Sequence, residues 1–499
     1  MSYSTAESVT AQARPPLFKG SVKTRLFRVP ATLLGPLLGL LIVALFTVNG
    51  FMHYPGTMNN DSLSQYGQAV SGRYSDWHPP VMAWLWSWLR LIADGPGPLL
   101  LLHLALYWLG FGLLADGLRR AGHLGLALIM ALAGAFPPFL YINATVTKDV
   151  GLVASWLVAI GLLFWFRVQQ RRIPVACALV IAALLAYGTL VRSNAVFAIG
   201  PLLLYAIGPF SWLRSTRLIA AAVVVAVLAV PVTMQANRWL FNPSPLHPEQ
   251  SLFLFDLMGI AVHKAQPGLL EPSVSLSASE LQACYTPYWW DSLSSWGPCS
   301  ANVHRTEGEL VTAPEGLTQQ WAHTILQHPV AYVVHRLKHF NSSLLFVVPL
   351  KHIRLTPEFR TDNPAHAPPE VITEQDMRLD LLRKNPLIWP VTWVAWGIGV
   401  LAFISRQNPV PTVQLAKVLI VSALGYSCAY LLIGVATDMR YHYWSLVAIF
   451  SASVLVLPML MQGLRSRSAL LLGAIGLTTV VISIGVAARL FDFRAFVLA

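Results

Sequence analysis

Long apolar blocks alternate with short polar stretches along most of this chain. The blocks run for about 17–25 residues, the length that an α-helix needs to cross a hydrocarbon core of roughly 30 Å. The alternation therefore predicts an all-α polytopic membrane protein with about eleven transmembrane helices. We place the spans at residues 31–51, 97–116, 124–143, 149–166, 173–190, 195–210, 218–236, 387–404, 414–436, 441–461 and 468–488.

The composition agrees with a location in a bilayer. Hydrophobic residues make up 55% of the 499-residue chain and charged residues only 11%, and the mean hydropathy is +0.58. This leaves too little polar surface to cover a soluble globule of the same length. The net charge of +12 does not point to nucleic acid, because the basic residues cluster in short loops between apolar blocks. We expect membrane lipids, and no nucleic acid, as partners.

The basic residues also predict the orientation. Placing the basic tail in the cytoplasm puts most of the basic turns on the same side, as the positive-inside rule requires. These turns contain Arg119, Arg120, Arg167, Arg171, Arg172, Arg214, Arg217, Arg406, Arg465 and Arg467. The alternation works only if residues 79–93 do not form a span. This stretch opens with two prolines and is rich in tryptophan, which favours a helix lying along the outer interface.

The chain then divides into four parts. They are a cytoplasmic tail (1–30), an N-terminal transmembrane module (31–236) with a first outer loop (52–96), an outer segment (237–386) and the C-terminal transmembrane helices (387–499). The outer segment is the candidate extramembrane domain, and we expect it to be a periplasmic domain of mixed or α structure. Most polar residues that could carry chemistry fall on this outer face.

The outer segment contains two of the four cysteines, Cys284 and Cys299. They could form a disulfide if the segment lies in an oxidising compartment. The loop between them is rich in tryptophan and tyrosine. Such residues could stack on a sugar or rest in the lipid headgroup layer, and interface anchoring is the favoured interpretation.

The first outer loop carries a carboxylate that is a candidate general base. If the residues after Asn60 are helical, Asp61 and Gln65 share a helix face at the spacing i,i+4. A carboxylate held there could deprotonate an acceptor hydroxyl. The alternative is that Asp61 only caps the N-terminus of a helix, a position that suits aspartate.

Three further segments place charge on the outer side. Lys148 and Asp149 begin a span, where the lysine could meet a lipid phosphate, although ordinary capping with a snorkelling lysine would explain the pair as well. Arg192 and Arg440 run against the positive-inside bias. A guanidinium can hold a phosphate with two hydrogen bonds, whereas the alternative is a structural ion pair with Asp438 or another carboxylate.

Asp256 is a weaker candidate. It lies in the apolar run at 252–257 of the outer segment, where a lone polar residue is more often a satisfied structural group than a site residue.

The order of motifs in the first loop resembles a known family. Asp61, a helix containing Tyr66, then Gly72, and finally His78-Pro79-Pro80 look like the first periplasmic loop of the GT-C glycosyltransferases. These include the protein O-mannosyltransferases and the aminoarabinose transferase of lipid A. The segment from Asp438 to Tyr441 is similar to the Arg-Tyr elements at the outer ends of late spans in that superfamily.

The resemblance implies a transferase of the bacterial cytoplasmic membrane, which moves a sugar from a polyprenyl-phosphate donor to an acceptor hydroxyl with inversion. Asp61 would be the base, and His78 would orient the loop or bind substrate. The implied substrate- and phosphate-binding residues are Gln65, Tyr66, Lys148, Asp149, Arg192, Arg440 and Tyr441. A divalent metal is left open, because some members use one, although no acidic pair in this chain marks a convincing metal-ligand set.

Two other functions stay open. A polymerase or ligase could join whole glycans on the same face. A transporter or flippase is disfavoured, because transporters usually place ionisable residues near the membrane midplane, whereas these spans are nearly free of charge. The Thr-Lys-Asp segment at 147–149 departs from the best-known GT-C families, and the outer segment matches none of them. The sugar and the acceptor therefore do not follow from the resemblance.

Overall fold

The computed structural model describes residues 30–208, 215–271, 273–294, 297–302, 316–349 and 384–491. Within these ranges the regular elements are helices, and the β-structure is limited to three isolated bridges. The fold is therefore all-α in the described part, as the hydrophobic pattern predicts. The predicted cytoplasmic tail up to residue 29, and residues 350–383 of the predicted outer segment, lie outside the described residues.

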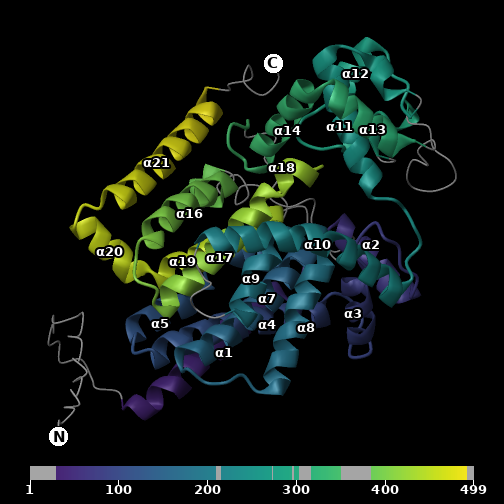
Figure 1. Ribbon diagram of the computed structural model, residues 1–499. Coiled ribbons are helices and arrows are strands. Elements are labelled where there is room, and N and C mark those ends of the chain that lie inside the picture. The colour runs from purple at the N-terminus through teal and green to yellow at the C-terminus, as the bar shows by residue number, and fades with distance from the viewer. Residues whose placement is uncertain are drawn as a thin grey trace, which may run out of the picture.

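The N-terminal half forms a bundle with two short helices on its first loop (Figure 1). Its elements are α1 (Ala31–His53), α2 (Asn60–Ser71), α3 (Val81–Leu89), α4 (Gly97–Arg120), α5 (Leu124–Ala133), α6 (Pro137–Asn143), α7 (Lys148–Val168), α8 (Val175–Val191), η1 (Ser193–Ala195), α9 (Val196–Ile207) and α10 (Ser215–Phe241).

The rest of the chain adds a group of helices at one end and then returns to the bundle. The elements of the group are α11 (Glu249–Lys264), η3 (Pro267–Leu270), α12 (Ala278–Cys284), η4 (Asp291–Leu293), η5 (Ser300–Asn302), α13 (Leu317–Gln327) and α14 (Pro329–Ser343). The returning elements are η8 (Pro386–Ile388), α16 (Pro390–Ser405), α17 (Pro411–Cys428), α18 (Tyr430–Ile433), η9 (Met439–His442), α19 (Tyr443–Leu455), α20 (Leu457–Arg465) and α21 (Ala469–Leu490).

Six to eight candidate membrane spans are present among the described residues. Six helices are long and apolar enough alone: α1, α4, α7, α10, α17 with α18, and α21. Two bent pairs qualify together, α5 with α6 at 46° and η9–α19 with α20 at 63°. The other predicted spans, 173–190, 195–210 and 387–404, fall on the shorter apolar helices α8, η1 with α9, and α16. The total of eleven stays a prediction.

Helix α7 lies at the centre of the bundle. Its apolar window is 89% buried, whereas the windows of α1, α10 and α21 are only 17% buried and expose leucine and valine side chains. Gly110 of α4 permits the close packing of α4 and α7, since a Cβ added at this glycine would lie 2.6 Å from Cβ of Leu157 in α7. The first residues of α7 are therefore fixed by the most buried helix, which matters because Lys148 and Asp149 are among them.

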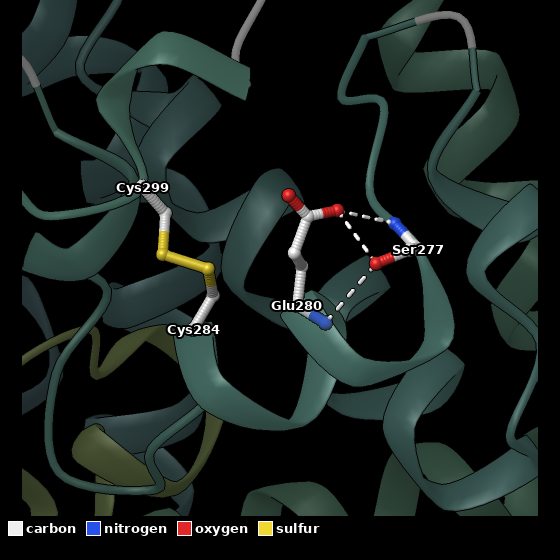
Figure 2. The surroundings of a disulfide bond; sticks show 4 residues. All are labelled: Ser277, Glu280, Cys284 and Cys299. Atoms are coloured by element: carbon white, nitrogen blue, oxygen red, sulfur yellow. Dashed lines mark hydrogen bonds between the residues drawn. A yellow bond between two sulfur atoms is a disulfide. The ribbon is translucent and has the colours of Figure 1, made fainter.

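Helices α11 to α14, which we term the α11–α14 module, have a hydrophobic core of their own. It includes Leu254, Met258 and Trp290 and is distinct from the core of the bundle. Figure 1 shows the module grouped at one end of the molecule. A disulfide joins Cys284 and Cys299 within it. Figure 2 shows this bond beside the capping box of α12, in which Ser277 and Glu280 satisfy each other's backbone amides.

Candidate functional site

The first loop is held against the start of α7 by backbone pairing. Thr57 and Thr145 form a parallel β-bridge, in which the amide of Val146 donates to the carbonyl of Thr57 at 2.9 Å. The hydroxyl of Ser62 donates to the carbonyl of Val146 at 2.5 Å. Two segments more than eighty residues apart are thus fixed side by side, and the N-terminus of α2 lies next to that of α7.

Asn59, and not Asp61, is the N-cap of α2. The side chain of Asn59 accepts a hydrogen bond from the amide of Ser62 at 2.8 Å. The alternative that Asp61 serves as the cap is therefore wrong, although Asp61 lies in the first turn, where the helix dipole favours a negative charge. Gln65 is buried, and its amide donates to the carbonyl of Asp61 at 3.1 Å. The carboxylate of Asp61 is left to contact other segments.

Arg440 joins three carboxylates from three parts of the chain. Its Nη2 donates to Oδ2 of Asp61 at 2.9 Å, and its Nη1 donates to Oδ2 of Asp149 at 3.2 Å. Its Nε donates to Oδ2 of Asp438 at 2.9 Å. Arg440 is 2% exposed, whereas the side chain of Asp61 is 29% exposed. The guanidinium is thus the buried centre of the cluster, and Asp61 is its most accessible member among the three carboxylates.

Lys148 and His78 complete one side of the cluster. Nζ of Lys148 lies 2.9 Å from Nδ1 of His78 and 3.8 Å from Oδ2 of Asp61. Burial, reinforced by the charge of Lys148, lowers the pKa of His78 to about 3. The ring is therefore neutral, and the ammonium group donates to Nδ1, so Nε2 carries the proton. Because Lys148 is buried among these partners, the alternative of a snorkelling lysine is wrong.

Arg192 lies on the other side, beside Asp149 and two tyrosines. Its Nε is 3.0 Å from Oδ1 of Asp149, and its Nη2 donates to the hydroxyl of Tyr430 at 2.9 Å. The guanidiniums of Arg192 and Arg440 lie 4.6 Å and 4.9 Å from the centroid of the Tyr441 ring. The ring of Tyr441 stacks on that of Tyr430, with centroids 5.7 Å apart. Aromatic faces stabilise both cations in this way.

Six charged side chains, which we term the ionic site, therefore meet at one place. They are Asp61, Asp149, Asp438, Lys148, Arg192 and Arg440. Burial alone would raise the pKa of Asp61, but the charges of Arg440 and Lys148 outweigh it and hold that pKa well below its usual value. Burial raises the pKa of Asp438 to about 7, although Arg440 opposes the shift. Three cations thus face between two and three negative charges near neutral pH.

Three of the residues singled out from the sequence do not join the ionic site. The hydroxyl of Tyr66 accepts from the amide of Gly95 at 2.9 Å, so this ring holds α2 against the loop after α3. Asp256 lies in the α11–α14 module, where it pairs with Arg336. The side-chain amide of Gln65 donates to the backbone carbonyl of Asp61. Tyr66 and Asp256 are better explained as structural residues.

Tyr430 was not identified from the sequence. It lies four residues after Tyr426, at the outer end of the predicted span 414–436. The spacing of these two tyrosines, close to an arginine predicted to lie on the outer side, could have indicated Tyr430 as a site residue.

The carboxylates of the ionic site are arranged around a guanidinium. Among the described residues, no group of three or more His, Cys, Asp or Glu side chains could hold a metal ion. An anion that binds Arg440 would therefore compete with the three carboxylates that this guanidinium already contacts.

No protein-family model, no curated protein and no solved structure matches this chain.

Proposed function

We propose that this protein is a glycosyltransferase of the bacterial cytoplasmic membrane. It would move a sugar from a polyprenyl-phosphate donor to an acceptor hydroxyl of a glycan, lipid or protein on the outer face. The observation that carries the proposal is the contact of Arg440 with Asp61 at 2.9 Å, which places a candidate phosphate ligand beside a candidate base. Such a transfer needs both groups at one point.

Asp61 is suited to accept the proton of the acceptor. Its Oδ2 is held by Arg440. Its Oδ1 lies 3.8 Å from Nε2 of His78, which is too far for a hydrogen bond. None of the hydrogen bonds found among the described residues of the site ends on Oδ1 of Asp61. Because the side chain is 29% exposed, Oδ1 is the atom that an acceptor hydroxyl would reach. His78, neutral with its proton on Nε2, would orient that hydroxyl.

The three cations are suited to stabilise the leaving group. The acceptor oxygen would attack the anomeric carbon, the bond from that carbon to the phosphate oxygen would break, and the acceptor proton would pass to Asp61. The phosphate then changes from a diester with one negative charge to a monoester with two. Arg440 has five N–H groups, of which three are used by Asp61, Asp149 and Asp438. The remaining donors, with Lys148 and Arg192, would bind the phosphate.

Phosphate binding would also activate the base. As long as no phosphate competes for Arg440 and Lys148, these cations depress the pKa of Asp61, and the carboxylate is a weak proton acceptor. A phosphate that draws Lys148 and Arg440 toward itself would weaken their hold on Asp61, so the pKa of this carboxyl would rise toward its usual value. This exchange favours binding of the donor before proton transfer.

The location of the active face and the choice of acceptor complete the proposal. The distribution of basic turns favours an outer location for the ends of the bundle that carry Asp61, Lys148 and Arg440. The α11–α14 module lies at the same end, since α14 packs against α18 just before Asp438. We therefore place the module in the periplasm, where it would help to select the acceptor.

Mass spectrometry of carrier lipids and surface glycans tests the proposal. A strain lacking the gene would be complemented with wild type, Asp61→Asn or Asp94→Asn at equal protein level. Asp94 is the matched control, because it is a loop carboxylate paired with Arg90 but 76% exposed and outside the ionic site. We expect Asp61→Asn to reduce transfer by about 10²–10⁴-fold, with one glycan modification lost and its lipid donor accumulated.

Accumulation of a lipid-linked oligosaccharide, in place of a single-sugar lipid, would indicate the polymerase or ligase alternative. Full complementation by Asp61→Asn would refute the assignment of Asp61 as the base and would return the transporter to consideration.

A further inference from the structure

A second buried ion pair lies in the α11–α14 module. Arg336 of α14 is 3% exposed and Asp256 of α11 is fully buried, and Nη2 of the arginine lies 2.5 Å from Oδ1 of the carboxylate. Nε1 of Trp321 in α13 donates to the other carboxylate oxygen at 2.8 Å. One cation, one anion and an indole N–H thus tie three helices of the module together.

Arg336 also reaches out of the module. Its Nη1 donates to the carbonyl of Gly434 at 2.6 Å, at the C-terminal end of α18. A Cβ at Gly434 would lie 2.5 Å from Nε2 of His339, so only glycine allows this close approach to α14. Arg336 therefore connects the core of the module to the segment that runs from α18 into η9.

The loop enclosed by the disulfide holds the next residues of the same segment. The amide of Trp290 donates to the carbonyl of Val435 at 2.8 Å, and Trp289 forms an antiparallel bridge with Ala436. Consecutive carbonyls of the segment, those of Gly434 and Val435, are thus both bound by the module. Asp438 and Arg440 follow within a few residues.

The far end of the segment is fixed as well. Nε2 of His442 lies 2.9 Å from the hydroxyl of Ser343, the last residue of α14. Nδ1 of His442 lies 2.9 Å from the hydroxyl of Ser427 in α17. Residues 437–441 are therefore bounded on both sides by contacts that the module makes. Between these contacts, the side chain of Asp438 accepts from the amide of Arg440 at 3.1 Å and closes a turn.

We propose that the α11–α14 module sets the position of Arg440 in the ionic site, and that Arg336 is the positioning residue that transmits it. Because it takes Arg440 to be a phosphate ligand, the inference rests on the proposed function. A displacement of about 1 Å at a reacting group can reduce turnover about 10²-fold. The hydrogen bond from Arg440 to Asp61, at 2.9 Å, would not survive a shift of that size.

Hydrogen exchange of the purified full-length protein in detergent tests the positioning directly. The amides of Arg440 and Tyr441 both donate to Asp438, so their exchange reports on the turn that presents Arg440. In Arg336→Lys the charge opposite Asp256 is kept, but a single ammonium group cannot replace the forked contact with both Asp256 and Gly434. We expect these amides to exchange about tenfold faster, the scale set by one hydrogen bond.

Trp321→Phe is the matched control. It removes a hydrogen bond from the same carboxylate but leaves the contact of Arg336 with Gly434 in place. Faster exchange at 440 and 441 in Arg336→Lys alone supports the positioning role. Unchanged exchange in a folded Arg336→Lys, or an equal increase in both variants, would overturn it. If Arg336→Lys does not fold, Ser343→Ala, which removes the contact of the module with His442, tests by the same two outcomes whether the module sets the position of this segment.

Binding of farnesyl phosphate separates this inference from the proposed function. If wild type binds this probe, Arg336→Lys should weaken the affinity at least about tenfold, and Trp321→Phe should not. If wild type does not bind it, the proposed function loses its support, while the exchange measurement still decides whether Arg336 positions Arg440.

Discussion

Two of the buried arginines in the described part of the chain, Arg440 and Arg336, have opposite surroundings. Nη2 of Arg336 pairs with the carboxylate of Asp256, and its Nη1 donates to the backbone carbonyl of Gly434. Arg440 faces three carboxylates, with Lys148 and Arg192 beside them. Asp256 is fully buried, whereas the side chain of Asp61 is 29% exposed.

This difference separates a structural ion pair from a site that can exchange charge. A sealed pair needs only one partner of each sign, and removing either one leaves an uncompensated buried charge. The ionic site instead concentrates like charges that repel each other and keeps one carboxylate accessible. Perturbed groups of this kind are typical of functional sites. Substitutions in each region test this difference.

The largest expected effect is on stability, from Asp256→Ala. The substitution leaves Arg336 buried without its carboxylate, which should lower the free energy of unfolding by about 3–5 kcal/mol. Asp61→Ala should lower it less, because Arg440 keeps Asp149 and Asp438 as partners. Thermal unfolding of both variants in the same detergent measures the difference. Equal losses would mean that the two arginines do not differ as we describe.

The pH dependence of stability should differ between the two regions. In the module, burial lowers the pKa of His335 and lowers that of His339 to about 3. Below pH about 6.5 these histidines are protonated in the unfolded chain but stay neutral in the folded protein, so stability falls with falling pH. In the ionic site, His78 acts with the same sign, since its pKa is also about 3.

Asp438 acts with the opposite sign. Its pKa is raised to about 7 in the fold, so between about pH 7 and its ordinary value near 3.8 the folded protein binds the extra proton. The contribution of Asp438 to the free energy of unfolding therefore increases as the pH falls, and it offsets the loss caused by His78. The depressed pKa of Asp61 has no effect in this window, because that carboxyl is ionised in both states above its ordinary value.

Two substitutions should therefore change the acid slope in opposite directions. His339→Gln should flatten the loss of stability on acidification, by at most about 1.4 kcal/mol per pH unit for one proton. Asp438→Asn should steepen it, because the offsetting group is lost. Denaturant unfolding at a series of pH values from about 7.5 to about 4.5 gives both slopes. Slopes that change in the same direction would contradict the assignment of the two groups.

Much of the fold was predictable from the hydrophobic pattern, because lipid exposure demands long apolar helices whatever they pack against. Each predicted block falls on a helix or a bent helix pair. The short helices α8, α9 and α16 show the limit of this argument. Apolar length cannot separate a span from a buried helix that ends within the bundle.

The ionic site was predictable in part, through charge placed against the topological bias. Arg192 and Arg440 were singled out for that reason, and both contact Asp149. The roles of Arg336 and Gly434 were not predictable, because their contact joins positions 98 residues apart and follows from packing alone. The sequence contains a single acidic residue in the run at 252–257 and gives no sign of its partner in α14.

The smallest expected effect separates the cap of α2 from the candidate base. Asn59→Ala removes the side chain that accepts from the amide of Ser62, and should cost about 1 kcal/mol of stability. Its effect on transfer should be slight, since the pairing of Thr57 with Thr145 still holds the loop on α7. Asp61→Asn should do the reverse, with a smaller change in stability and a large loss of transfer. Thermal unfolding and the glycan assay on the same preparations compare the two. If Asn59→Ala abolished transfer at full protein level, the site would depend on the geometry of the first turn of α2 more than on the carboxylate itself.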